Sequence, residues 1–189
     1  MILGNTAILE AIKAGRLKIG DLTGDEDPGQ QPFNTTSIDL HLNDQISVLQ
    51  VAPAAFDLRK PGISKFLSDN SKSPQATLEQ PFTLRPGDFV LAITLEKINL
   101  PIDPEKTAYS ARVEGRSSIA RCGVLVHFTA PTIHAGFSGP ITLEIANLGP
   151  IDFLLYPGLA ICQLIIEEVL GEVVPTENQF IGQTTPTGL

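Results

Sequence analysis

Alternating apolar and polar positions recur along the chain in short runs. Residues 37–42 carry apolar side chains at every second position, and residues 141–146 do the same, which is the pattern of a β-strand with one buried face. Residues 46–51 have a similar composition, and we expect them to pair with 37–42 as a hairpin. Pro-Gly turns at 85–88 and 156–159 lead into further apolar runs. Short strands joined by frequent turns predict a mainly β protein with a β-barrel or jelly-roll-like fold.

Helical periodicity is limited to the N-terminal residues. Ile8, Leu9 and Ile12 would share one face of a short helix, which Asn5 can cap and which ends near Gly15. No stretch after residue 20 sustains the helical period, so we expect no long helix elsewhere.

Two segments are predicted to be irregular. Residues 24–32 are acidic and contain Gly and Pro, while residues 59–81 combine Lys, Ser, Asn and Pro without a sustained period. We interpret the second segment as a long surface loop. Its basic residues are expected to form a solvated rim; they are Arg59, Lys60, Lys65 and Lys72.

Composition limits the classes of protein that fit. A chain of 189 residues with 42% apolar and 18% charged side chains is expected to form one folded domain over residues 1–189. The net charge of −8 argues against a general nucleic-acid-binding or anionic-membrane surface. No signal peptide or apolar run of transmembrane length is visible, so we expect a soluble, cytoplasmic protein. Cys122 and Cys162 lack CxxC and metal-ligand spacing, and we expect both to be buried thiols.

Residues 112–147 contain the side chains best suited to chemistry. Arg116, Ser117, Ser118 and Arg121 form a donor cluster, and guanidinium and hydroxyl groups match phosphate oxygens. Turn chemistry alone would also explain an Arg-Ser-Ser sequence. Glu144 is the one charge in an otherwise uncharged strand, which makes it a general-base candidate or an ordinary solvent-facing residue.

At these residues the chain resembles the dCTP deaminases, which belong to the dUTPase-like superfamily. The matching motifs are Gly-Arg-Ser-Ser-Ile-Ala-Arg at 115–121, Val-His-Phe-Thr-Ala at 126–130, Gly-Phe-Ser-Gly-Pro-Ile-Thr-Leu-Glu at 136–144, Ser-Ile-Asp-Leu at 37–40, Pro-Gly-Leu-Ala-Ile-Cys-Gln-Leu at 157–164 and Gly-Gln-Thr-Thr-Pro-Thr-Gly at 182–188. The resemblance implies a distorted β-barrel of the dUTPase-like fold. It also implies a homotrimer whose active sites lie between neighbouring subunits.

The resemblance further implies roles for individual residues. Glu144 would be the general base and proton shuttle, Ser117 and the main-chain carbonyl of Ala130 would hold the attacking water, and Arg121 would pair with Glu144. The tail, residues 171–189, would close over the nucleotide. The implied nucleotide-binding residues are Arg116, Ser117, Ser118, Ile119, Ala120, Arg121, His134, Thr142, Leu143, Glu144, Gln179 and Gln183.

Two further residues near these motifs are interpreted as structural. His127 lies on the polar face of a predicted strand at 123–129, and a structural histidine is the simpler interpretation. Asp39, in the Ser-Ile-Asp-Leu motif, is expected to orient the barrel and the subunit contact.

The cysteines and histidines bear on the metal requirement. The commoner cytidine deaminases hold zinc with a His or Cys and a CxxC motif, and this chain has neither a Cys pair nor an HxE sequence. We therefore expect no zinc and assign no metal-ligating residue. A triphosphate substrate brings Mg²⁺ on its phosphate oxygens.

The chain departs from the family pattern in three ways. Relatives usually carry an aspartate where this chain has His134, and a Lys-Tyr pair where it has Gln179-Phe180. A tyrosine that contacts phosphate in relatives has no clear counterpart in 171–178. These departures concern the phosphate contacts and the choice of substrate.

Three functions are compatible with these residues. The leading hypothesis is hydrolytic deamination of dCTP to dUTP and ammonia, which feeds dUMP and dTTP synthesis, with dTTP as a possible feedback inhibitor. The second is a dUTPase, or a bifunctional enzyme that converts dCTP to dUMP and pyrophosphate. The third is a nucleotide-binding relative without catalytic activity, against which Glu144, Arg121 and Ser117 argue.

Overall fold

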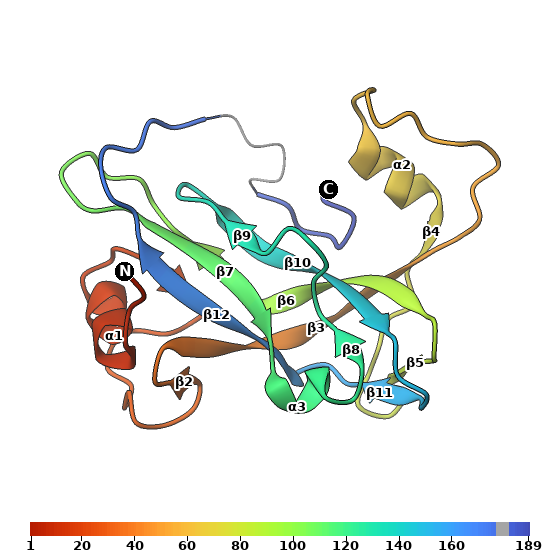
Figure 1. Cartoon of the computed structure of the whole chain (residues 1–189), viewed down its shortest axis with the longest axis horizontal. Coiled ribbons are helices and arrows are strands. Elements are labelled where there is room, and N and C mark those ends of the chain that lie inside the picture. The colour runs from red at the N-terminus through yellow and green to blue at the C-terminus, as the bar shows by residue number, and fades with distance from the viewer. Residues whose placement is uncertain (177–181) are drawn as a thin grey trace.

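The structure is a computed structural model that describes residues 1–176 and 182–189. Its elements in chain order are α1 (Asn5–Lys13), β1 (Lys18–Ile19), β2 (Phe33–Asn34), β3 (Ser37–Leu49), α2 (Ile63–Asp69), β4 (Ser71–Lys72), β5 (Phe82–Leu84), β6 (Phe89–Asn99), β7 (Tyr109–Gly115), α3 (Ser117–Ala120), β8 (Val124–Leu125), β9 (Thr132–Ile133), β10 (Ser138–Asn147), β11 (Phe153–Leu155) and β12 (Ala160–Glu168) (Figure 1). The prediction of a mainly β protein with a short N-terminal helix is confirmed. None of the helices in the described residues is long and apolar enough to span a bilayer.

One curled antiparallel sheet forms the body of the molecule. Its strand order is β8-β10-β6-β3-β12-β7-β9, with β1, β2 and β4 attached at the sides, and β11 and β5 form a second, small sheet. The apolar face of the curled sheet encloses the core, which α1 covers at one end (Figure 1). This arrangement agrees with the expected distorted β-barrel.

β10 follows the predicted alternation. Leu143 and Ile145 are fully buried in the core, while Thr142 and Glu144 are partly exposed on the opposite face. β10 pairs with β6 along almost its whole length, and Glu144 lies opposite Leu91. The Pro-Gly turns are also confirmed, since Gly87 and Gly158 have positive φ and lead into β6 and β12.

The predicted hairpin of 37–42 with 46–51 is wrong, because β3 is one strand from Ser37 to Leu49. Its first half pairs with β12 and its second half with β6, and the register shifts between Leu42 and Ile46. Such an irregularity bends a strand and increases its twist. β3 thus joins β12 to β6 within the curled sheet and does not fold back on itself as a hairpin.

The start of α1 also differs from the expectation. The cap position is Gly4, and Asn5 is the first helical residue. The Asn5 side chain instead donates a hydrogen bond from Nδ2 to the Pro28 carbonyl at 2.9 Å. Gly15 ends the helix in the left-handed conformation, as predicted, with a φ of 67°.

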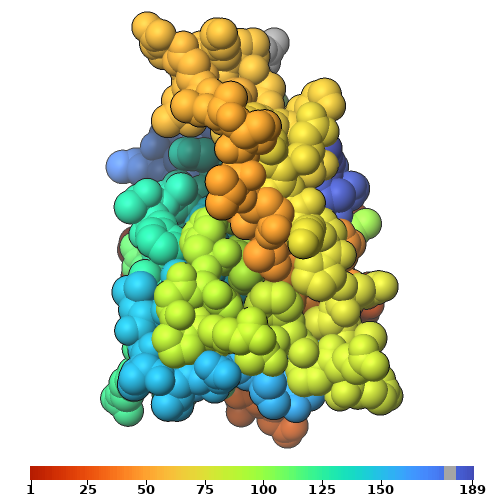
Figure 2. All heavy atoms as spheres, turned by 90° about the vertical axis from the view of Figure 1, so that its right-hand side faces the viewer, coloured from red at the N-terminus to blue at the C-terminus, as the bar shows by residue number. Residues whose placement is uncertain are grey.

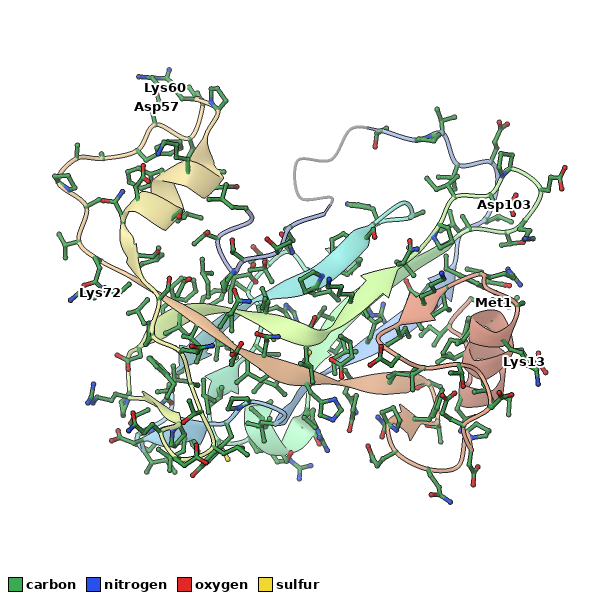
Figure 3. The ribbon with its side chains drawn as sticks, turned by 180° about the vertical axis from the view of Figure 1, so that it is seen from behind. Met1, Lys13, Asp57, Lys60, Lys72 and Asp103 are labelled. Atoms are coloured by element: carbon green, nitrogen blue, oxygen red, sulfur yellow. The ribbon has the colours of Figure 1, made fainter. Side chains whose placement is uncertain are left out.

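The segment expected to be a loop at 59–81 contains α2 and β4. No residue of α2 is buried, and the segment projects from one end of the molecule (Figure 2). Lys60 and Lys72 point away from the sheet (Figure 3), and Arg59 and Lys65 pair with Asp57 and Asp69. The α2 helix is too short for its periodicity to stand out in the sequence.

The two cysteines occupy different environments, so the expectation that both are buried is wrong for Cys122. Cys122 is an exposed free thiol, because it follows α3 at the surface. Cys162 is a buried free thiol on β12, and its burial, together with the nearby charges of Glu96 and Asp39, raises its pKa to about 12.

We predict that Leu164→Ala lowers the free energy of unfolding by about 2–5 kcal/mol, because Leu164 is fully buried and its truncation leaves a cavity. Leu148 is 71% exposed, so Leu148→Ala should change the free energy by less than about 0.5 kcal/mol. Urea denaturation of both variants tests this difference. Equal losses would show that the core does not lie where the structure places it.

Candidate active site

A cavity of about 1250 Å³ lies against the outer face of β10. The 126–131 segment, β9, β10 and the C-terminal tail supply most of its lining, and Leu67 of α2 reaches its rim. Five predicted site residues line it together: Ala130, His134, Thr142, Glu144 and Gln183. This volume is large enough for a nucleotide with its phosphates.

Glu144 lies where this cavity meets a smaller one. The second cavity, of about 520 Å³, is lined by Phe89, Phe128, Thr129, Ala130 and Glu144. The backbone amide of Phe128 donates a hydrogen bond to Glu144 Oε2 at 3.4 Å. The Phe89 and Phe128 rings pack edge to face with centroids 5.5 Å apart, which gives this carboxylate an apolar neighbour. Glu144 therefore faces open space in which a water could lie beside its carboxylate.

Two polar atoms in the wall of the larger cavity lack partners. Thr142 Oγ1 and His127 Nδ1 are buried, and neither has a hydrogen-bond partner among the described residues. A buried polar atom without a partner costs about 1–3 kcal/mol. Both residues line the larger cavity, so a polar ligand that reached these atoms would remove this cost.

His127 was not among the predicted nucleotide-binding residues. The expected strand at 123–129 is limited to β8 (Val124–Leu125), so His127 lies in the irregular segment that borders the cavity. Its Nε2 lies 3.9 Å from Glu114 Oε2. Only the aromatic and polar composition of Val-His-Phe-Thr-Ala could have indicated this position.

The C-terminal tail crosses β10 beside the cavity. Gln183 Nε2 donates a hydrogen bond to the Pro140 carbonyl at 2.8 Å, and the Gly182 amide donates one to Ser138 at 2.8 Å. Gly139 permits this close approach, because it has a φ of 148° and an added Cβ would lie 3.3 Å from the Gln183 carbonyl oxygen. Gln179 lies outside the described residues.

The predicted phosphate-binding residues 116–121 lie elsewhere. Arg116 caps α3, which contains Ser117, Ser118, Ile119 and Ala120, and Arg121 follows it. None of the six lines either cavity. The expected pair between Arg121 and Glu144 is absent within the chain, since Arg121 is exposed and forms no ion pair with any described residue.

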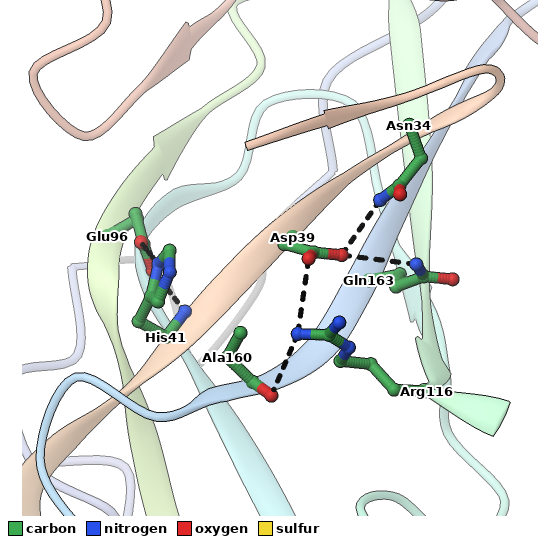
Figure 4. Close-up of polar contacts among 7 residues, drawn as sticks. All are labelled: Asn34, Asp39, His41, Glu96, Arg116, Ala160 and Gln163. Atoms are coloured by element: carbon green, nitrogen blue, oxygen red, sulfur yellow. Dashed lines mark hydrogen bonds and ion pairs between the residues drawn. The ribbon is translucent and has the colours of Figure 1, made fainter. Parts of the chain in front are cut away.

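The side chains of Leu143 and Arg116 are held in other surroundings. Leu143 is fully buried in the core, so only its backbone could contact a nucleotide. The Arg116 guanidinium lies 3.2 Å from Asp39, and its Nη1 donates a hydrogen bond to the Ala160 carbonyl at 3.3 Å (Figure 4). Asp39 is a polar position of the alternating 37–42 segment, for which one buried, apolar face is expected, yet it is only 1% exposed because these neighbours cover it.

Among the described residues, no group of three or more His, Cys, Asp or Glu side chains is placed to hold a metal ion. The chemistry visible at the cavity is that of one carboxylate with main-chain and side-chain hydrogen-bonding groups.

Comparison with known proteins identifies the family to which the chain belongs. The family model described as dCTP deaminase-like matches residues 2–169. The chain belongs to the dCTP deaminase-like family. A relative from Methanosphaera stadtmanae, named dCTP deaminase, dUMP-forming, is 34% identical, and the alignment covers 98% of this chain and 91% of the relative. A relative from Thermomicrobium roseum, named dCTP deaminase, is 36% identical with the same coverage of both chains.

The fold is similar to that of a solved member of this family. The crystal structure of 2′-deoxycytidine 5′-triphosphate deaminase from Agrobacterium tumefaciens aligns with a TM-score of 0.62 and 22% identity. The alignment covers 87% of this chain and 47% of the Agrobacterium tumefaciens chain, so this chain spans about half the length of that chain. This similarity concerns the fold alone.

We predict that Thr142→Val weakens dCTP binding about 10-fold and does not lower the free energy of unfolding of the free protein, because it removes a buried hydroxyl that has no partner among the described residues. The loss of this hydroxyl therefore removes only an interaction with the ligand. Calorimetric titration with dCTP and Mg²⁺ measures the affinity, and denaturation measures the stability.

Thr94→Val is the matched control. Thr94 Oγ1 donates to the Glu96 carbonyl at 2.8 Å and accepts from the Ile141 amide at 2.9 Å. The control should lose about 1–3 kcal/mol of stability because it leaves these backbone groups unpaired. If Thr142→Val proves the more destabilising of the two, the interpretation of Thr142 as a ligand contact is wrong.

Proposed function

We propose that the protein converts dCTP and water to dUTP and ammonia. The observation that carries this proposal is the position of Glu144, a carboxylate that lines two cavities together with Ala130, the larger of which Thr142 also lines. The names of the relatives support the substrate, because proteins about 35% identical over nearly the whole chain are named dCTP deaminase. We further propose that the protein acts on the nucleotide pool of the cytoplasm.

In the proposed reaction, Glu144 takes a proton from a water as its oxygen bonds to C4 of the cytosine ring. The carboxyl group passes that proton to N3, which gives a tetrahedral intermediate. A second proton transfer, from the new hydroxyl to the amino group, lets the C4–N bond break and ammonia leave. The Ala130 carbonyl and the Ser117 hydroxyl would orient the water, which favours the reaction by fixing its geometry.

Residues 116–121 require a second subunit in this proposal. They line neither cavity of their own chain, yet they supply the hydroxyls and guanidinium groups suited to the water and the triphosphate. We propose a homotrimer in which α3 of one subunit completes the cavity of its neighbour. Arg121 would then pair with Glu144 across the interface.

A second candidate is a bifunctional enzyme that releases dUMP and pyrophosphate. The observation that favours it is the name of the Methanosphaera stadtmanae relative, dCTP deaminase, dUMP-forming. Cleavage of the triphosphate needs a second activated water. The side chain at the position where relatives usually carry an aspartate is His134, which is exposed at the rim of the cavity. An imidazole holds its acceptor nitrogen at a different distance from the backbone than a carboxylate, so we propose dUTP as the product.

We predict that dCTP with Mg²⁺ yields ammonia and dUTP in equal amounts, with little dUMP. Chromatography of the nucleotides alongside an ammonia assay measures both products. Incubation with dUTP should release no pyrophosphate at a comparable rate. Release of pyrophosphate as fast as ammonia would establish the bifunctional reaction, and an absence of ammonia would overturn the proposed function.

We predict that Glu144→Gln lowers the rate of deamination by about 10²–10⁴-fold or more, because the amide cannot take up the proton. The amide keeps the shape of the side chain, so the affinity for dCTP should change by only a few-fold. Glu79→Gln is the control, since Glu79 is exposed and lines neither cavity. Near-normal turnover of the Glu144→Gln variant would remove Glu144 from the reaction.

We also predict that activity survives treatment with a zinc-specific chelator and requires Mg²⁺ bound to the triphosphate. The physical reason is the placement of the thiols, since Cys162 is buried in the core and Cys122 is exposed after α3. The described residues also include no group of three or more His, Cys, Asp or Glu side chains that could form the tetrahedral set that zinc requires. Stoichiometric zinc in the purified active protein, measured by atomic emission, would contradict this prediction.

A further inference from the structure

A buried carboxylate lies directly beside Arg116. Asp39 is 1% exposed and lies near the start of β3, between the core residues Ile38 and Leu40. An ionised carboxylate at such a position is costly unless hydrogen bonds and a counter-charge compensate for the lost water. The groups that contact Asp39 therefore indicate the role of this carboxylate.

The two oxygens of Asp39 have different surroundings. Oδ1 accepts hydrogen bonds from Asn34 Nδ2 at 2.8 Å and from Gln163 Nε2 at 3.1 Å. Gln163 is the register partner of Asp39 on β12, and Asn34 comes from β2, so two elements lock the carboxylate plane. Oδ2 accepts no hydrogen bond from any described residue and lies 3.2 Å from Arg116 Nη1.

Arg116 is the one cation that pairs with Asp39 among the described residues. The amide donors on Oδ1 are neutral and cannot balance its charge, so the guanidinium supplies the compensation. The Ala160 carbonyl accepts from the same nitrogen at 3.3 Å. One end of the guanidinium is thus fixed from two sides (Figure 4).

The other nitrogens of the guanidinium have no hydrogen-bond partner among residues 1–176 and 182–189. Arginine has five N–H donors in a planar fork, and the contacts to Asp39 and Ala160 involve only Nη1. The Arg116 side chain is 31% exposed and immediately precedes the exposed Ser117 and Ser118. A fixed guanidinium loses less conformational entropy on binding a phosphate than a free one.

We infer that Asp39 is a positioning residue for phosphate recognition, which holds the Arg116 guanidinium in place for the triphosphate of the substrate. This inference rests on the proposed function, because it takes a nucleoside triphosphate as the ligand. It assigns to Asp39 a role beyond the structural one expected from the sequence. The negative charge of Asp39 weakens the electrostatic attraction between Arg116 and phosphate. In return, the contact holds the guanidinium in a defined orientation.

The test is a double-mutant cycle of Asp39→Asn and Arg116→Ala, read by calorimetric titration with three probes: dCTP with Mg²⁺, inorganic tripolyphosphate and deoxycytidine. Asp39→Asn keeps the size of the side chain and removes its charge. We expect it to weaken dCTP and tripolyphosphate about 10- to 100-fold and to leave deoxycytidine affinity unchanged. In the Arg116→Ala background, Asp39→Asn should have little further effect, because it acts through Arg116.

A purely structural role would give a different result. In that case Asp39→Asn would lower the affinity for all three probes equally, or its effect would add to that of Arg116→Ala. Either outcome overturns the inference. If Asp39→Asn fails to fold, Asn34→Ala decides, since it removes one of the two donors that fix Oδ1 and leaves the ion pair. We expect this variant to lose several-fold in tripolyphosphate affinity with unchanged deoxycytidine affinity, and an unchanged tripolyphosphate affinity overturns the inference.

The wild-type protein separates this inference from the proposed function. If it binds and deaminates dCTP while Asp39→Asn leaves all affinities unchanged, the inference fails and the function stands. If it binds tripolyphosphate in an Asp39-dependent manner but does not deaminate dCTP, the function fails and the positioning role stands. Failure to bind either phosphate ligand overturns both.

Discussion

The antiparallel ladder between β10 and β6 is the constraint on which the candidate site depends. It places Leu143 and Ile145 in the core and directs Thr142 and Glu144 to the cavity. Side chains alternate along a strand, so a slip of one residue would bury the Glu144 carboxylate and expose the apolar positions. Both changes are costly. The hydrophobic core therefore fixes the orientation of the proposed base.

The donor cluster lies outside the cavity that contains this base. α3 follows β7 and contacts β8, which pairs with the end of β10, and none of residues 116–121 lines either cavity. Each chain thus has a cavity without the arginines and a donor cluster without a cavity. Symmetric association can bring these two surfaces together, because an interface between identical subunits can join different patches of each. Within its own subunit, the ion pair with Asp39 holds the Arg116 guanidinium of the donor cluster in place.

Local patterns in the sequence were sufficient to predict β10, the Pro-Gly turns and the N-terminal helix, because alternation and turn chemistry depend on neighbouring residues. They failed for β3, whose continuity depends on pairing with β12 and β6, and for Asp39, which is covered by a residue 124 positions away. The motif resemblance indicated Ala130, Thr142 and Glu144 but could not show that 116–121 lie outside their cavity. That His127 Nδ1 is buried without a partner among the described residues could be found only from the three-dimensional structure.

The central claim is that Glu144 and Ser117 of one site come from different subunits. Mixing two inactive variants, Glu144→Gln and Ser117→Ala, under conditions that exchange subunits tests it most directly. Neighbouring chains can then combine an intact Glu144 with an intact Ser117, and random mixing in equal amounts should restore about a quarter of wild-type dCTP deamination. If the mixed protein exchanges subunits and stays inactive, the site is not shared in this way.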